Sequence, residues 1–255
     1  MVEEAITSGG LSAAELDFMR SVEDSHWWYR ALRRHVVDSI HPPTPEFSLL
    51  DAGCGSGGML GWMRERFPQA SLTGLDLNQH ALRLTEERTT GARLVHGSVD
   101  RMPLDEAEFD FVTALDVLYH RDVDDGAALR EIHRVLRPGG TLIVNVAAFE
   151  FLRGSHDVAT NTARRYTRPK LGKLLKDSGF TVETLTYWNM ILLPAVALVR
   201  WLSRGQAHRP DVRSDLSLPA PALNIILQWI AQSELACSRR IALPFGTSLF
   251  AIARK

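Results

Sequence analysis

The fold of this 255-residue chain is decided by the stretch Leu49-Leu50-Asp51-Ala52-Gly53-Cys54-Gly55-Ser56-Gly57-Gly58. An apolar run that begins at Phe47 precedes the glycines, as expected for a buried strand. A predicted helix follows, and one of its faces gathers the apolar residues Met59, Leu60, Met63 and Phe67. Strand, glycine-rich turn and helix in this order let the backbone approach a nucleotide closely, because glycine has no Cβ.

Asp51 indicates which kind of nucleotide the turn receives. Gly53, Gly55 and Gly58 satisfy the G-x-G-x-x-G pattern of dinucleotide-binding proteins. A carboxylate two residues before the first glycine would repel a pyrophosphate, but it suits a ligand with a charged amino group and a sulfonium. The glycine pattern alone leaves an NAD-dependent dehydrogenase open as an alternative.

Further blocks of sequence follow the glycine stretch at regular spacings: Gly74 to Asp76, Gly97 to Leu104, Phe109 to His120 and Arg134 to Gly140. With these blocks the chain resembles class I S-adenosylmethionine (SAM)-dependent methyltransferases of the bacterial small-molecule, type 11-like kind. The resemblance implies an α/β fold, with a Rossmann-like sheet of seven strands and helices on both faces. It also implies an N-terminal helical cap, a helical insertion before the last strand and SAM as the cofactor; no metal is expected.

Composition excludes several other classes of protein. The 29 basic and 30 acidic residues give a net charge of −1, so there is no global attraction to nucleic acid. Cys54 and Cys237 are the only cysteines, which fits a reducing compartment. The N-terminus lacks a secretory signal pattern, and the apolar run from Met190 to Val199 is broken by Pro194 and too short to span a bilayer. We expect a cytoplasmic protein.

Alternating apolar and helical patterns predict the order of the elements. Strands are expected at 47–52, 71–76, 92–96, 109–115, 140–147, 180–188 and 247–253. Helices are expected at 57–67, 78–88 and 124–137, after helical residues 12–40 that end at a proline cluster. The predicted division is a helical cap at 1–44, a SAM-binding core at 45–188, a helical insertion at 189–243 and the final core strand at 244–255.

The insertion is unusual, since roughly 55 residues separate the last two strands where a short hairpin is usual. It is expected to hold a nearly all-apolar helix before Arg204 and an amphipathic helix, with these residues on one side: Leu223, Ile226, Leu227 and Ile230. We expect a lid or wall of the acceptor pocket. A dimer interface and, last, a membrane contact are the alternatives, so the chain is predicted to be a monomer or a homodimer.

The resemblance assigns the cofactor site by position. Gly53, Gly55 and Gly57 are expected to shape the turn beneath the methionine portion of SAM, with Asp51 anchoring its amino group. Asp76 ends the second predicted strand, where an acidic side chain accepts the ribose hydroxyls. Both aspartates are otherwise interpreted as helix-cap or turn residues. The remaining predicted contacts of the adenine side and of the fourth strand are Leu77, Ser98, Val99 and Asp116.

An aromatic cluster precedes the core, from His26 to Arg30. Trp28 can stabilise a sulfonium by cation–π attraction, and Arg30 can pair with the carboxylate of the cofactor. The alternative is that the tryptophans only fix the cap to the sheet.

Two segments are candidates for the acceptor site. Tyr119 and His120 end the fourth strand and could orient or deprotonate a nucleophile. The loop after the fifth strand contributes His156, Arg164, Arg165 and Tyr166, which are predicted to contact the substrate, with His156 also a catalytic candidate. The alternative for this loop is a structural polar network.

These observations predict methyl transfer from SAM to O, N or C of a small, largely apolar or aromatic acceptor in specialised metabolism. One alternative is an acceptor that bears a lipid or a diphosphate, held by Arg164 and Arg165. Another is a SAM-binding scaffold without catalysis.

Overall fold

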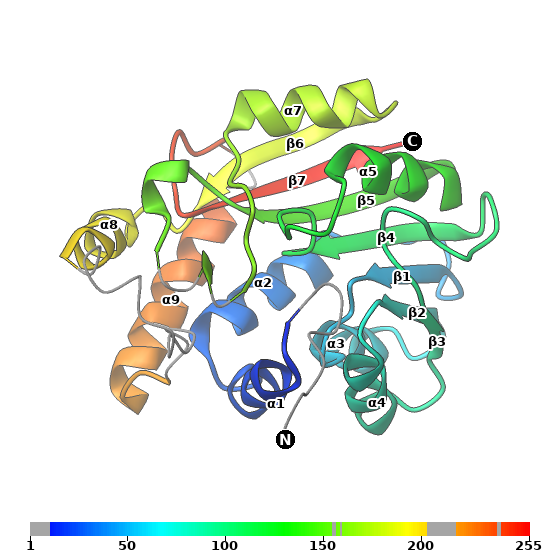
Figure 1. The fold of residues 1–255 in the computed structure, drawn as a ribbon, viewed down its shortest axis with the longest axis horizontal. Coiled ribbons are helices and arrows are strands. Elements are labelled where there is room, and N and C mark those ends of the chain that lie inside the picture. Colours follow the sequence, from blue (N-terminus) through cyan, green and yellow to red (C-terminus); the bar gives the residue numbers. More distant parts are fainter. Residues whose placement is uncertain (1–10, 155–156, 159, 203–217, 239–240) are drawn as a thin grey trace, which may run out of the picture.

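The computed structural model describes residues 11–154, 157–158, 160–202, 218–238 and 241–255. Its centre is a seven-stranded sheet in the order β3-β2-β1-β4-β5-β7-β6 (Figure 1). The strands are β1 (Ser48–Ala52), β2 (Ser71–Asp76), β3 (Arg93–His96), β4 (Phe109–Leu115), β5 (Leu136–Ala147), β6 (Thr181–Trp188) and β7 (Ser248–Arg254). The predicted fold class is confirmed.

Strand directions follow from the connections. Strands β1 to β5 pair in parallel, because a helix follows β1, β2 and β4 and returns the chain to the same edge of the sheet. Strand β7 pairs antiparallel with both β5 and β6 and lies between them. One boundary was wrong: the helix expected at 124–137 ends at Val135, and β5 begins at Leu136, because Leu136 already pairs with Phe109.

Helices cover both faces of the sheet (Figure 1). They are α1 (Ala13–Val22), α2 (Trp27–Val37), α3 (Gly58–Arg66), α4 (Gln79–Arg88), α5 (Asp125–Val135), α7 (Arg168–Asp177), α8 (Leu193–Leu202) and α9 (Pro221–Ser238), with the short η1 (Glu150–Leu152). Leu49 and Leu50 point to opposite faces, and each joins a different buried cluster. The cluster around Leu50 includes residues of α5 and α7; the cluster around Leu49 includes residues of α2, α3 and α9.

The two insertion helices exist as predicted, but their packing differs from the expectation. Of the four residues expected on one apolar side of the second helix, Leu223 and Ile226 are exposed in α9, whereas Leu227 and Ile230 are half-buried. The buried residues of α9 lie near its end, at Ala231, Glu234 and Leu235. Among the described residues, no helix combines the length and the apolar character that crossing a membrane requires.

Candidate cofactor and acceptor site

The glycine turn follows β1, and its glycines adopt the left-handed backbone conformation, which is strained for other residues. Gly53, Gly55 and Gly57 have φ values of 83°, 54° and 76°. A Cβ on Gly53 would lie 2.7 Å from Val117, and one on Gly57 would lie 2.8 Å from the Thr85 backbone. The Gly53 amide also donates to the Leu75 carbonyl at 2.7 Å, which fastens the turn to β2.

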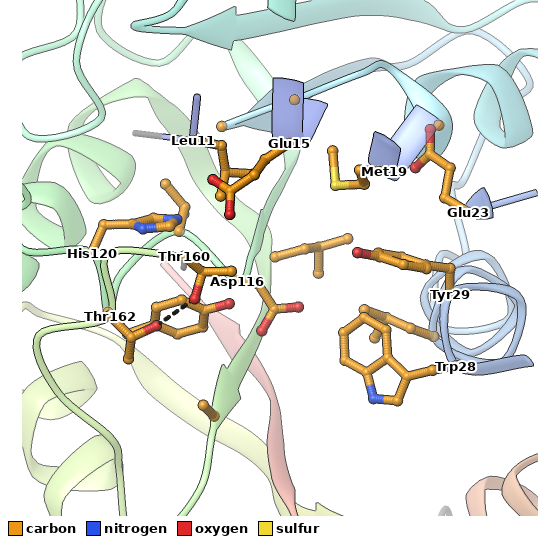
Figure 2. A pocket seen from close by; sticks show the side chains of 18 of the residues that line it. Leu11, Glu15, Met19, Glu23, Trp28, Tyr29, Asp116, His120, Thr160 and Thr162 are labelled. Carbon is orange, nitrogen blue, oxygen red and sulfur yellow. Dashed lines mark hydrogen bonds between the residues drawn. The ribbon is translucent and has the colours of Figure 1, made fainter. Parts of the chain in front are cut away.

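A cavity of about 640 Å³ opens above this turn, a size typical of small-molecule sites. Its lining begins at Asp51, Gly53, Gly55 and Asp76 and continues to the insertion, with Val196 and Arg200 of α8. Side chains from the cap helices α1 and α2 face Asp116 and His120 across it (Figure 2). Gly57 is not in the lining; it holds the loop against α4 instead.

Two carboxylates, the buried Asp51 and the half-buried Asp76, form the floor of the cavity near the turn. Asp51 accepts a hydrogen bond from the Thr113 hydroxyl at 2.7 Å, and burial raises its pKa to about 7. Asp76 accepts from the amides of Gly55 and Asn78, at 2.9 and 2.8 Å, and burial raises its pKa as well. The turn thus presents negative charge, and Asp76 also fixes the shape of the loop.

Asp116 is a third carboxylate in the cavity wall, where it is half-buried (Figure 2). It follows β4 in the left-handed region, with φ of 57°, which few non-glycine residues adopt. The Asn145 amide donates to both its oxygens, at 3.1 and 3.0 Å, and Asn145 in turn accepts from the Trp188 indole at 2.8 Å. Burial raises the pKa of Asp116 to about 7.

The predicted adenine contacts lie together at another part of the lining. Leu77, Ser98 and Val99 all border the cavity. The Ser98 hydroxyl donates to Asp100 at 2.6 Å, so its oxygen remains able to accept a hydrogen bond. Their contact with the cofactor stays a prediction.

The cap contributes Trp28 to the cavity, and the same side chain fixes the cap to the sheet. Its ring stacks on Trp188 at 5.5 Å and meets Tyr29 edge-on at 5.1 Å. Arg30 does not line the cavity. The cap arginine that does is Arg33, one helical turn further along α2, so the structure does not bring Arg30 to the cavity.

Arg33 belongs to a buried ionic network that the sequence analysis missed. Glu23 accepts hydrogen bonds from Arg33, Arg88 and the Ser56 hydroxyl. Because Ser56 belongs to the glycine turn and Glu23 follows α1, the network joins the cap directly to the turn. Charged residues spaced along a helical pattern were the only signal, and they usually indicate a solvated face.

Tyr119 and His120 both line the acceptor side of the cavity. Burial lowers the pKa of His120, so its imidazole is neutral near pH 7 and able to accept a proton. Its Nδ1 has no hydrogen-bond partner among the described residues. Burial, with the nearby Asp116 carboxylate, raises the pKa of Tyr119 well above its ordinary value, so the phenol stays protonated and donates.

Of the loop after β5, the structure brings Arg165 to the cavity together with Asp157. Arg165 donates to both oxygens of Asp157, at 2.7 and 3.0 Å. Arg200 of α8, which the prediction did not include, donates to the same carboxylate at 2.9 Å and lines the cavity as well. Burial would raise the pKa of Asp157, but the two arginines hold it below its ordinary value.

The other predicted substrate contacts are not in the cavity lining. Arg164 pairs with Asp125 at 3.3 Å. Tyr166 is fully buried and donates to Asp125 at 2.7 Å and to the Leu118 carbonyl. Both side chains therefore belong to the polar network that the loop was alternatively expected to form. His156 lies outside the described residues.

Two hydroxyl side chains were also missed. Thr160 and Thr162 line the cavity beside His120, and their hydroxyls are 2.9 Å apart (Figure 2). No sequence pattern distinguishes these threonines from ordinary loop residues, because only the path of the loop in three dimensions brings their side chains into the cavity.

Taken together, the parallel sheet with an antiparallel seventh strand, the glycine turn and the acidic floor define the class I SAM-dependent methyltransferase fold. Residues 50–144 match the protein family described as "Methyltransferase domain". We therefore identify this part of the chain as a methyltransferase domain, and the predicted cofactor of the domain, SAM, is confirmed. The family match therefore favours a SAM-binding methyltransferase domain over the alternative that the glycine pattern left open, an NAD-dependent dehydrogenase.

Curated relatives share the domain but differ in their acceptors. The chain is 36% identical over 102 residues to malonyl-[acyl-carrier protein] O-methyltransferase of Pseudescherichia vulneris, covering 40% of this chain and 39% of the relative. It is 33% identical over 138 residues to demethylmenaquinone methyltransferase of Listeria monocytogenes, covering 51% and 57%. The chain thus spans about half the length of the curated relatives it matches.

Solved structures match nearly the whole chain at low sequence identity. A SAM-dependent methyltransferase from Mesorhizobium loti superposes with a TM-score of 0.58 at 19% identity, covering 91% of this chain and 100% of that structure. At this identity the likeness concerns the fold. The residue roles, the domain division, the oligomeric state and the compartment stay predictions.

Proposed function

We propose that this protein transfers a methyl group from SAM to O, N or C of a small, largely apolar or aromatic acceptor. The observation that carries the proposal is the continuity of the cavity. One part is the glycine turn with its carboxylates, and another is lined mostly by apolar side chains from the cap and the insertion, with the charged Glu15, Arg33 and Arg200 among them. A donor and an acceptor can therefore share one enclosed space.

The residues at the turn fit SAM. Its amino group and sulfonium are cationic, and the carboxylates of Asp51, Asp76 and Asp116 border the space where they would lie. Only glycine fits at position 53, because a Cβ there would collide with Val117. The backbone of Gly53 therefore lines the cavity without a side chain, and a ligand can lie against it. When bound, SAM supplies an electrophilic methyl group. Asp76 is assigned to the ribose and Asp51 to the amino group.

On the acceptor side, the chain offers one proton acceptor and one donor. His120, neutral because it is buried, can take the proton that an attacking hydroxyl or amine releases. Tyr119 keeps its phenol proton and can orient the acceptor by donating a hydrogen bond. Alignment and exclusion of water supply much of the rate in such displacements.

The nature of the acceptor follows from the walls of the cavity. Leu16, Trp28 and Leu32 of the cap and Leu192 and Val196 of the insertion line it, so a large part of its surface is apolar. This lining favours an acceptor that buries hydrocarbon or an aromatic ring.

A diphosphate-bearing acceptor is less well supported than an uncharged one. Arg164 pairs with Asp125 outside the lining, and Arg165 shares Asp157 with Arg200. Two arginines against one buried carboxylate leave a single positive charge at the wall. That balance suits one carboxylate on an otherwise apolar acceptor better than it suits a diphosphate.

The test is methyl transfer by the purified chain. Incubation with SAM carrying a labelled methyl group and a panel of phenols, aromatic amines, apolar carboxylic acids and prenyl diphosphates should label members of the first three groups. Labelling confined to the diphosphates would contradict the proposed acceptor. Tight SAM binding without turnover on any acceptor would favour the non-catalytic scaffold.

A further inference from the structure

Strand β5 places Asn145 between Asp116 and Trp188, behind the wall of the cavity. Asn145 is fully buried and does not line the cavity itself. Its amide nitrogen donates to both oxygens of Asp116, at 3.1 and 3.0 Å, and its amide oxygen accepts from the Trp188 indole at 2.8 Å. The Asp116 backbone amide also donates to the Asn145 carbonyl at 2.9 Å. Asn145 therefore holds Asp116 through both the main chain and the side chain.

The orientation of the Asn145 amide follows from its two partners. An indole N–H only donates hydrogen bonds, and an ionised carboxylate only accepts them. The amide oxygen must therefore face Trp188 and the amide nitrogen must face Asp116, because the reverse would set donor against donor and acceptor against acceptor. Trp188 is fully buried, and its ring is held by stacking on Trp28. The structure thus directs a fixed donor at the Asp116 carboxylate.

Asp116 lies where the turn end and the acceptor end of the cavity meet. Its neighbour in sequence, Val117, is the side chain that a Cβ on Gly53 would meet at 2.7 Å, so Asp116 is beside the glycine turn. In Figure 2 its carboxylate lies between His120 on one side and Tyr29 of the cap on the other. Asn145 approaches the same carboxylate from outside the cavity lining, so other lone pairs of its oxygens remain available to a ligand.

We propose that Asn145 is a positioning residue, which Trp188 orients and which holds the Asp116 carboxylate toward the place where the donor meets the acceptor. A carboxylate in this place attracts the positive charge that SAM carries beside its reactive methyl group. The site of the acceptor in this description rests on the proposed function. The hold of Asn145 on Asp116 does not depend on it.

The hydrogen bonds from Asn145 also favour the charged form of Asp116. Burial raises the pKa of Asp116 to about 7, and the Asn145 bond opposes that rise more than any other group does. The remaining titratable groups that face Asp116 come from α2, from the segment after β4 and from the loop after β5, and they are Tyr29, Tyr119, His120 and Arg165. Loss of the Asn145 donor should therefore leave Asp116 protonated to a higher pH.

Calorimetric titration of SAM at several pH values tests this role without any acceptor. Asn145→Leu keeps the approximate shape of the side chain but removes the donor. The pH at which SAM affinity rises should move up by about one unit in this variant, because a hydrogen bond to a charged group is lost. Affinity at high pH should return toward that of the wild type. Trp188→Phe keeps the stacked ring but frees the amide to turn over, so it should move the profile in the same direction.

Two controls tie the effect to Asp116. Ser48→Ala removes a hydroxyl that donates to Asp110 of β4 at 2.8 Å, and neither residue lines the cavity, so the profile should stay that of the wild type. In a chain that already carries Asp116→Asn, Asn145→Leu should not shift the profile further. Circular dichroism checks folding. If Asn145→Leu fails to fold, Trp188→Phe carries the test, since it retains the ring.

Several results would overturn the proposal. A purely structural role would weaken SAM binding in Asn145→Leu by the same factor at every pH. A shift that persists in the presence of Asp116→Asn would place the effect on another group. An unchanged profile in Trp188→Phe would mean that the indole does not orient the amide. A wild-type affinity that is constant from about pH 6 to pH 8 would mean that Asp116 does not face the donor.

Discussion

At the scale of single residues, the acidic floor of the cavity was predictable and the basic residues were not. Asp51 and Asp76 occupy strand ends, and a parallel sheet brings such positions to one edge. Arg30 was placed by its closeness in sequence to the aromatic cluster. On a helix, however, residues three apart lie on the same side. The side chain of Arg33, three residues after Arg30, therefore points to the same side of α2, and it reaches the glycine turn at Gly58.

Replacing Asp76 tests the ribose assignment. Asp76→Ala should weaken SAM binding at least about a hundredfold, because two charge-assisted hydrogen bonds of about 1.5–3 kcal/mol each would be lost. Isothermal titration calorimetry measures the affinity, and circular dichroism checks the fold because Asp76 also binds the Gly55 amide. Asp177→Ala, an exposed site on α7, is the matched control. Unchanged affinity in Asp76→Ala would remove the ribose role.

The raised pKa values of Asp51 and Asp116, both about 7, predict two opposite pH dependences. SAM affinity should rise between about pH 6 and pH 8, since the carboxylates become negative in that interval. Stability without ligand should fall as the pH rises from about 4 to about 7 and level off above that. A folded-state pKa above the unfolded value of 3.8 means that the folded form binds extra protons, and their stabilising effect is lost as the pH rises through 7.

Calorimetry and urea unfolding at several pH values measure the two trends. In Asp116→Asn both should become shallower, because one of the two titrating groups is gone. Parallel pH trends in affinity and stability would contradict the assignment of these carboxylates to the cationic donor.

His120 is expected to act on turnover rather than on cofactor binding. His120→Ala should lower kcat by about 10²-fold or more if the imidazole accepts the acceptor proton, and should leave SAM affinity within about twofold. His133→Ala, on α5 and outside the cavity lining, serves as the control. An unaltered rate in His120→Ala would mean that His120 is not the base, and that the alignment of donor and acceptor supplies the catalysis.

At the scale of elements, the cap and the glycine turn behave as one unit because Glu23 joins them. Its carboxylate receives Arg33 from α2, Arg88 from the end of α4 and Ser56 from the turn. The sequence predicted the cap as a separate segment, 1–44, because a proline cluster follows it. A buried ionic network between segments leaves no local sequence pattern, so this coupling could be found only in three dimensions.

Breaking this network should therefore loosen both elements. Glu23→Gln is expected to cost about 3 kcal/mol in the free energy of unfolding, because it removes the buried carboxylate of the network and leaves buried Arg33 paired only with the exposed Asp24. Urea denaturation measures the loss. Asp38→Asn removes the exposed pair with Arg34 and should change stability by less than about 1 kcal/mol. Equal effects of the two substitutions would mean that Glu23 does not hold the cap.

At the scale of the whole molecule, the sheet and its helices were predictable from the sequence, and the packing of the insertion was not. Alternation of strands and helices predicted the parallel part of the sheet, whereas the seven-stranded sheet was implied by the resemblance and the place of β7 between β5 and β6 comes from the structure. For α9, helical periodicity indicated an apolar side but not what covers it. Leu223 and Ile226, which were expected on that apolar side, project into solvent.

The tryptophans give the molecule two optical reporters of different kinds. Trp28, half-buried in the cavity lining, stacks on the fully buried Trp188, whereas Trp201 and Trp229 face solvent. Indole emission shifts to shorter wavelength in apolar surroundings, so the exposed pair should emit at longer wavelength than the stacked pair. We expect S-adenosylhomocysteine to quench the short-wavelength emission and aqueous iodide to quench the long-wavelength emission of the exposed Trp201 and Trp229. A single fluorescence titration would thus record the two ends of the protein separately.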